Sequence, residues 1–139
     1  MRQSPSGKPL PEITDMTRPF WEGARNGILR IQKCRSCSTY DFFPKPSCIS
    51  CGRRTLDWVD MSGRGEVYAF SVATTVMMNL PAWKDDLPVI LCLIDLEEGG
   101  RMYARLTGCE PEDVRIGMQV RAQFSVLDDE VGVPAFQPV

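Results

Sequence analysis

The C-terminal half of the chain alternates apolar and polar residues in the way that is typical of β-strands. The clearest case is residues 118–127, where every second side chain is apolar: Val120, Ala122, Phe124 and Val126. Four more segments are rich in β-branched, aromatic or continuously apolar residues: 65–76, 88–94, 101–106 and 134–139. The pattern therefore predicts five strands and a mainly β fold.

The connections between these strands favour a small closed barrel. One helical turn over Pro111–Val114 is expected between the third and fourth strands, and the pattern shows no long helix. An oligonucleotide/oligosaccharide-binding (OB) barrel has this strand number and spacing, and an open sandwich is the alternative. Residues 79–87 are expected to form a long loop between the first two strands, which in an OB barrel borders the ligand-binding face.

The N-terminal part predicts an extended arm followed by a short helix. Residues 1–13 are rich in proline and serine, so we expect an arm that is poorly ordered unless something ties it down. Thr17 can cap a helix, Pro19 fits its first turn, and Gly27 is a natural stop. The adjacent rings of Phe20 and Trp21 cannot both face one surface, and we favour packing within the chain over docking on a partner.

Two CxxC pairs, Cys34–Cys37 and Cys48–Cys51, stand ten residues apart between the helix and the barrel. Each pair can present two sulfurs from a tight turn, and this spacing is typical of a tetrahedral four-thiolate metal site. Short strands around such a site predict a zinc ribbon, too small to fold without its ion. Its miniature core would be Tyr40, Phe42 and Trp58.

A metal is favoured over two disulfides because the opening MRQSPSGK lacks the apolar segment of a secretory leader. Zinc is the expected ion and iron the alternative, since geometry alone does not separate them. A zinc ion with four thiolates carries two net negative charges, which nearby cations could offset. The cations around the pairs are Lys33, Arg35, Lys45, Arg53 and Arg54.

The charge is unevenly distributed along the chain. Residues 1–60 hold ten Lys or Arg against six Asp or Glu, a net +4, whereas residues 61–139 hold six against twelve, a net −6. The longest apolar run, residues 89–94, is too short for a membrane span. We expect a cytoplasmic protein with an arm and helix at 1–27, a zinc ribbon at 28–60 and an OB barrel at 61–139.

Catalysis by this chain alone is disfavoured, and no catalytic residue is assigned. Histidine is absent, which removes Ser-His-Asp and Cys-His pairs. Cys92 is expected to be a small core residue. The charge of the neighbouring Glu110 should raise the pKa of the Cys109 thiol. The acidic residues at 85–86 and 128–130 are expected to lie in turns with their charges in solvent.

The order of helix, tetracysteine ribbon and five-stranded barrel resembles the DUF35 family of OB-fold proteins. The likeness runs from about Thr14 to the C-terminus and rests on four motifs: Pro19–Gly23, the cysteine turns with Gly52, Ser62–Gly65 and Gly108–Met118. The resemblance implies a rubredoxin-like zinc ribbon. It also implies a non-catalytic partner of thiolases, thiolase-like aldolases and related acyl-CoA enzymes, in a hetero-oligomer.

The resemblance leaves several points open. It implies that the subunit aids assembly and could contact the CoA part of the substrate, for which the basic ribbon would suit the phosphates. It does not identify the acyl group, the stoichiometry or the cofactor-binding residues. The alternative is single-stranded nucleic-acid binding, which the acidic barrel disfavours. We also expect most of the six aromatic residues of the barrel half to lie at core positions: Tyr68, Phe70, Trp83, Tyr103, Phe124 and Phe136.

Overall fold

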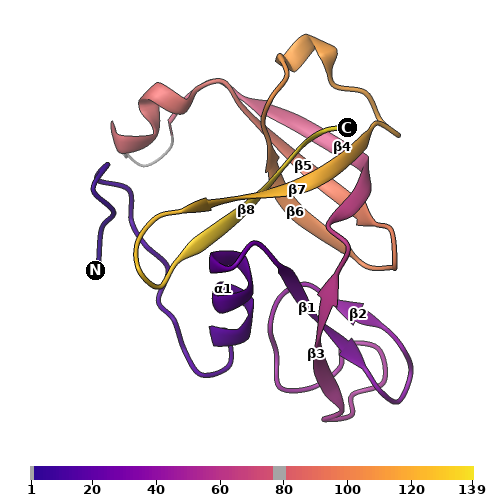
Figure 1. Cartoon of the computed structure of the whole chain (residues 1–139). Coiled ribbons are helices and arrows are strands. Elements are labelled where there is room, and N and C mark those ends of the chain that lie inside the picture. Colours follow the sequence, from indigo (N-terminus) through magenta and orange to yellow (C-terminus); the bar gives the residue numbers. More distant parts are fainter. Residues whose placement is uncertain (1, 77–80) are drawn as a thin grey trace.

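A computed structural model describes residues 2–76 and 81–139 (Figure 1). The helix α1 (Arg18–Arg25) is followed by a small antiparallel sheet with the strand order β2-β1-β3. Its strands are β1 (Leu29–Cys34), β2 (Tyr40–Asp41) and β3 (Leu56–Met61). Because β1 pairs with β3 along its whole length, from Leu29↔Met61 to Cys34↔Leu56, the ribbon is anchored to the chain that enters the barrel.

The second unit is a closed five-stranded barrel with the order β4-β5-β6-β8-β7, which confirms the predicted OB-like fold. Its strands are β4 (Arg64–Ala73), β5 (Val89–Leu96), β6 (Arg101–Leu106), β7 (Gln119–Val126) and β8 (Gly132–Pro138). Pairing of β4 with β7 closes the barrel, so the open sandwich was wrong. The first strand ends at Ala73, three residues before the predicted end at Val76.

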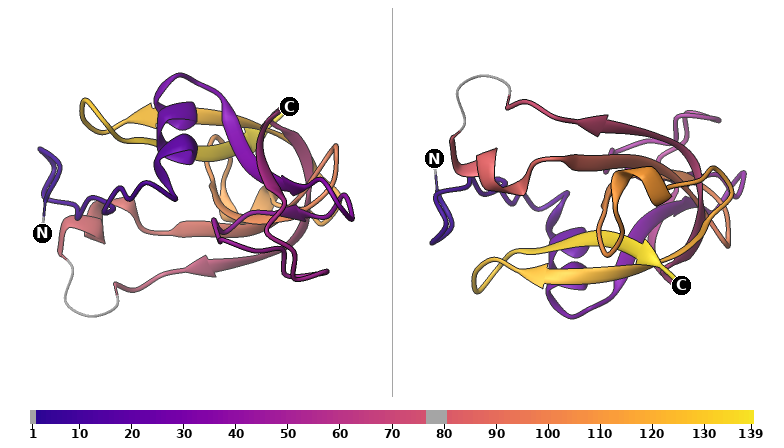
Figure 2. Two further views of the ribbon diagram at one scale, coloured as in Figure 1. Left: turned by 90° about the horizontal axis from the view of Figure 1, so that it is seen from below. Right: turned by 90° about the horizontal axis from the view of Figure 1, so that it is seen from above.

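The parallel contact between β6 and β8 is the sparsest strand pairing of the barrel. It has a single register pair, Leu106↔Phe136, whereas β5 and β6 are paired over six residues from Ile90 to Asp95. Figure 2 shows the β4–β5 pair and the β7–β8 hairpin spreading apart toward the side where the N-terminal segment lies. The barrel is therefore closed at one end and splayed at the other.

One hydrophobic core joins the ribbon to the barrel. Leu29 and Ile31 of β1 are buried in the same cluster as Ile94 and Phe136 of the barrel strands. Tyr40, Phe42 and Trp58, the predicted miniature core of the ribbon, are half-buried against this shared cluster. Burial of their rings therefore stabilises the junction between the units as well as the ribbon.

Helix α1 begins and ends near the predicted residues. Pro19 lies in its first turn, and Gly27 follows its end with a φ of 77°. Thr17 occupies the N-cap position, but its side chain does not cap the helix; its hydroxyl accepts a hydrogen bond from the Thr14 amide at 3.0 Å instead. Phe20 is buried and Trp21 half-buried at the core edge, so the packing interpretation is confirmed.

The N-terminal arm is held against the barrel. Leu10 is buried, Arg2 forms ion pairs with Asp128 and Glu130, and Lys8 pairs with Asp86 at 2.5 Å. Positions 79 and 80 of the predicted loop lie outside the described residues, and most of its remainder forms the 3₁₀ helix η1 (Pro81–Asp86). A second 3₁₀ helix, η2 (Pro111–Asp113), matches the predicted single turn.

The aromatic residues of the barrel depart from the prediction. Phe136 is fully buried, but Tyr68, Phe70 and Tyr103 are exposed by 48%, 38% and 60%. The β4–β5 register shifts between Val67 and Ala69, a bulge after which Phe70 lies opposite Cys92. Within the described residues, no helix is long and apolar enough to cross a membrane.

Candidate functional site

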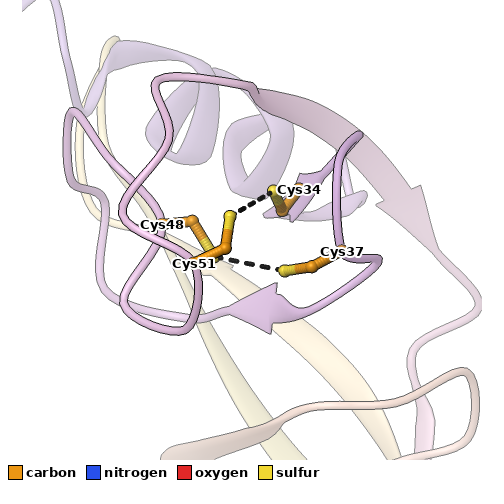
Figure 3. A group of neighbouring side chains, drawn as sticks. All are labelled: Cys34, Cys37, Cys48 and Cys51. Carbon is orange, nitrogen blue, oxygen red and sulfur yellow. Dashed lines mark hydrogen bonds between the residues drawn. The ribbon is translucent and has the colours of Figure 1, made fainter.

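The four cysteines of the two CxxC pairs converge in the ribbon (Figure 3). Their sulfur atoms all lie within 4.8 Å of one another, with Cys34 and Cys48 buried and Cys37 and Cys51 exposed. The shortest approaches, Cys34–Cys51 at 3.7 Å and Cys37–Cys48 at 3.6 Å, are far longer than a disulfide bond of about 2 Å. The arrangement is that of four separate ligands around a common centre.

The two turns carry the same backbone hydrogen bonds. In the first turn the Ser38 amide donates to the Cys34 carbonyl, and in the second the Gly52 amide donates to the Cys48 carbonyl, both at 2.9 Å. The Ser50 amide also points at the Cys48 sulfur, at 3.3 Å. Repetition of one turn geometry explains why each CxxC pair presents two sulfurs toward the same point.

Hydrogen bonds to sulfur favour the thiolate form on the first turn. The Thr55 hydroxyl, 3.2 Å from the sulfur, together with nearby amides lowers the pKa of Cys34 to about 6. Thr39 likewise lowers the pKa of Cys37. At Cys51 the Arg53 amide favours the thiolate, but burial and the three neighbouring sulfurs outweigh it and raise the pKa to about 11. Four thiolates so close together therefore require a cation among them.

The cations near the site are engaged in different ways. Arg35 pairs with Asp57 at 2.5 Å, Lys45 lies 3.6 Å from the buried Asp41, and the Lys33 ammonium lies over the Tyr40 ring. Arg53 and Arg54 are exposed, and neither forms an ion pair within the described part of the chain. These two arginines are the cations that remain for an anionic group near the second turn.

The remaining cysteines do not join this cluster. Cys92 is 1% exposed, as expected of a core residue, and burial raises its pKa to about 11. Burial also raises the pKa of Cys109, followed by the charges of Asp113 and Glu110. Both thiols are therefore poor nucleophiles at neutral pH.

One carboxylate of each acidic group, Asp86 and Asp128, is less solvated than the sequence indicated, whereas Asp85, Asp129 and Glu130 are exposed as expected. Asp86 is held between Lys8 and Arg105, and the Lys8 ammonium holds the pKa of its carboxyl below the usual range. Asp128 accepts hydrogen bonds from the Glu130 and Val131 amides and so shapes the β7–β8 turn. Both carboxylates are structural.

A groove that the sequence did not reveal lies over the gap between β6 and β8. Its volume is about 600 Å³, and its walls come from the arm, α1, the loop after β2, η1 and the barrel. The consecutive aromatics Phe42 and Phe43 and the lone Trp83, all outside regular barrel strands, are the sequence signal that could have pointed to it.

Known protein families share both units of this chain. A rubredoxin-like zinc ribbon model of ChsH2 matches residues 21–57, and the model of its C-terminal OB-fold domain matches residues 58–125. A probable enoyl-CoA hydratase alpha subunit from Thermomonospora curvata is 33% identical over 131 residues, or 94% of this chain. The match spans only 40% of that relative's length.

Two further relatives are matched over almost their full length. The benzoylsuccinyl-CoA thiolase subunit BbsA of Thauera aromatica is 30% identical over 138 residues, covering 95% of this chain and 92% of that one. A solved Ltp2-ChsH2(DUF35) aldolase chain superposes with a TM-score of 0.77 and 32% identity, covering 93% and 98%. With its zinc ribbon, its OB barrel and these relatives, the chain belongs to the DUF35 family.

Proposed function

We propose that this chain is a zinc-binding, non-catalytic accessory subunit of a thiolase-type acyl-CoA enzyme complex. The observation that carries the proposal is the combination of a closed four-sulfur site with relatives that are named as subunits of thiolase, aldolase and hydratase enzymes. A closed four-thiolate site has no open position for substrate, and its metal fixes structure.

The metal ligands in this proposal are Cys34, Cys37, Cys48 and Cys51. Zinc suits four thiolates in tetrahedral geometry, and iron is the alternative. The ion would join the two turns and staple residues 28–60 as the ribbon, leaving residues 1–27 as arm and helix and residues 61–139 as the barrel. Metal analysis of protein purified without added metal decides between the ions, with one zinc per chain as the expected result.

The accessory role predicts a stable hetero-oligomer. The full-length tagged chain should copurify with a thiolase-like protein, and native mass spectrometry should show both chains together with acyl-CoA cleaving or condensing activity. Recovery of a monomer that binds neither acyl-CoA nor a thiolase would overturn the proposal. A Cys109→Ser complex should keep both its assembly and its activity, because the raised thiol pKa argues against a catalytic role.

Contact with CoA is proposed for the basic edge of the ribbon. Arg53 and Arg54 are exposed and adjacent to the second cysteine turn, in the half of the chain with a net charge of +4. Guanidinium groups bind phosphates well. Replacing both arginines by glutamine should weaken CoA binding to the complex more than it weakens binding of dephospho-CoA. Equal effects on the two ligands would argue against contact with the 3′-phosphate.

Single-stranded nucleic-acid binding is the second candidate, and one observation favours it. Tyr68 and Tyr103 are exposed on the barrel, and the Arg101 guanidinium lies 3.4 Å from the Tyr68 ring centroid. Exposed rings can stack on bases, but Arg101 is already paired with Asp95 and the barrel half carries −6. Electrophoretic shift of labelled oligonucleotides at low salt would support this candidate.

A further inference from the structure

The groove over the splayed side of the barrel is a second place where this chain could bind a molecule. Its floor is the gap between β6 and β8, which beyond the Leu106–Phe136 pair have no register pairing. The two sides come from Phe20 and Trp21 of α1 and from Trp83 of η1. A volume of about 600 Å³ lies within the range of small-molecule sites, about 300–1,000 Å³.

The walls of the groove are predominantly apolar. Side chains of Phe42, Phe43, Tyr103 and Val133 line it, and Phe43 and Tyr103 remain 60% exposed. These two rings lie 6.4 Å apart although they come from the ribbon and the barrel. Water in such a site gains little from the walls, so the groove favours an apolar chain or ring.

One edge of the groove carries N–H groups of Arg105 that lack hydrogen-bond acceptors among the described residues. Arg105 lines it and gives two hydrogen bonds to Asp86, one to the carboxylate at 3.3 Å and one to the backbone carbonyl at 3.4 Å. A guanidinium has five N–H donors, so three remain, and the Nε group is buried without a partner among the described residues. A buried donor in this condition is costly until an oxygen accepts from it.

The same edge carries a net positive charge. Lys8 also lines the groove, and its ammonium lies 2.5 Å from the Asp86 carboxylate and 4.9 Å from the centroid of the Trp83 ring. Asp86 therefore faces two cations and can neutralise only one of them. An oxygen with negative charge, or with the partial negative charge of a carbonyl, fits beside Arg105.

The N-terminal arm forms part of one wall of the groove. It is anchored by Arg2 at the β7–β8 turn and by Lys8 at η1, and most of these ion-pair partners are partly exposed. The pairs of Arg2 are partly exposed and therefore weak, whereas the Lys8–Asp86 pair and the buried Leu10 hold the arm more firmly.

We propose that this groove binds an apolar chain or ring that ends in a carbonyl or carboxylate oxygen, with the oxygen at Arg105 and the apolar body between α1 and the barrel. The two sources of this chemistry are a free carboxylate and the acyl end of a thioester. The thioester reading rests on the proposed function, since it makes the groove the acyl site of the accessory subunit. The free-carboxylate reading does not.

The chain offers an internal probe for binding. Two of its three tryptophans, Trp21 and Trp83, line the groove, whereas Trp58 does not. A full-length Trp58→Phe protein therefore reports on the groove alone. It is titrated with decanoate, decanol, decanoyl-CoA and CoA, followed by tryptophan fluorescence and checked by calorimetry.

The expected result is saturable one-to-one binding of decanoate, of decanoyl-CoA, or of both, with decanol at least about tenfold weaker because it lacks the carbonyl oxygen. Preference for decanoyl-CoA over decanoate assigns the thioester as the source, and the reverse assigns the free acid. Failure of all four ligands to bind, or equal binding of decanol and decanoate, would overturn the proposal.

Variants test the position of the ligand. Arg105→Met should weaken decanoate at least about tenfold. The matched control Arg121→Met, at an exposed position outside the groove, should leave it unchanged. Ala135→Phe fills the groove and Leu91→Gln makes its wall polar, so at least one folded variant should lose binding. Binding that persists in both folded proteins would refute the location.

The same variants separate this inference from the proposed function. If Ala135→Phe loses ligand but still assembles with a thiolase partner, the groove is a ligand site on an accessory subunit. If the wild-type chain binds decanoate but assembles with no thiolase, the proposed function fails and the groove site stands. Loss of assembly in the groove variants, with no ligand binding in wild type, would make the groove a protein contact and overturn the inference.

Discussion

Ser38 and Gly52 hold the same backbone conformation at equivalent places in the two cysteine turns, with φ of 65° and 75°. Each follows the second cysteine of its pair and donates its amide to the carbonyl of the first. An L-residue at positive φ is strained by about 1–2 kcal/mol, and a glycine is not. The first turn therefore tolerates strain that the second avoids.

This asymmetry gives a prediction for both turns. A Cβ at Gly52 would meet no heavy atom within 4 Å, so Gly52→Ala tests backbone strain alone and should destabilise the metal-loaded protein by about 1 kcal/mol. Ser38→Gly should change stability by less than about 0.5 kcal/mol, because relief of strain is offset by greater freedom of the unfolded chain. Denaturant unfolding measures both.

Gly27 is the matched control for that pair. It has a φ of 77° and open space around it, but it follows α1 and lies outside the metal site. Gly27→Ala should cost a similar free energy of unfolding without changing metal affinity in a chelator competition. If Gly52→Ala left metal affinity unchanged as well, the turn geometry would not govern the metal site.

Metal removal should loosen more than the ribbon. Leu29 and Ile31 belong to the cluster that also holds the barrel core, so unfolding of the ribbon would expose part of the barrel interior. Treatment with a strong chelator should make four additional thiols reactive and increase binding of a hydrophobic dye. A barrel whose near-ultraviolet circular dichroism is unchanged after metal loss would contradict this coupling.

The Asp86 cluster should make docking of the arm sensitive to acid. Lys8 lowers the pKa of the Asp86 carboxyl in the folded protein. The stability that this carboxylate contributes is therefore present above the pKa of the unfolded chain, near 3.8, and is lost as the pH falls through the folded pKa. Asp86→Asn should cost about 1 kcal/mol at neutral pH after solvent screening is allowed for, and should flatten the acid limb of the stability profile. Asp85→Asn is the control, since Asp85 is exposed and forms no ion pair within the described residues.

Gly132 should be intolerant of any side chain. A Cβ there would lie 2.6 Å from the backbone of Ala24, where α1 packs on β8. Gly132→Ala should therefore cost about 1–3 kcal/mol in thermal or denaturant unfolding, because backbone has to move to relieve the clash. Ser125→Ala, an exposed change on the neighbouring strand, should stay within about 0.5 kcal/mol of wild type.

The features predicted well from sequence are those encoded locally. The spacing within each CxxC pair predicts its turn, and Pro19 and Gly27 predict the start and the end of α1 from neighbouring residues alone. The alternation over residues 119–126 gave β7, although Val126 is 55% exposed because it lies near the splayed end of the barrel. Local chemistry was sufficient for element type and for the sulfur cluster.

The features that were missed depend on contacts between distant residues. Tyr68 was expected in the core because of its residue type, yet it alternates with the buried Val67 and is exposed, and the bulge between Val67 and Ala69 changes the register beyond it. Asp86 looked solvated because its partner Lys8 lies 78 residues away in the chain. The groove is lined by the arm, α1, η1 and barrel strands that are distant in the sequence. A local sequence pattern cannot predict contacts between such distant segments.

The contact between β6 and β8 has a single register pair and is a weak seam in the barrel wall. At that seam the Thr107 amide donates to the Phe136 carbonyl at 2.8 Å, while the other strand neighbours are held by longer ladders. Widening the wall there would break very few backbone hydrogen bonds and would leave the ladders between the other strands intact. The Thr107 amide should accordingly exchange its hydrogen sooner than the amides at the centres of β5 and β7.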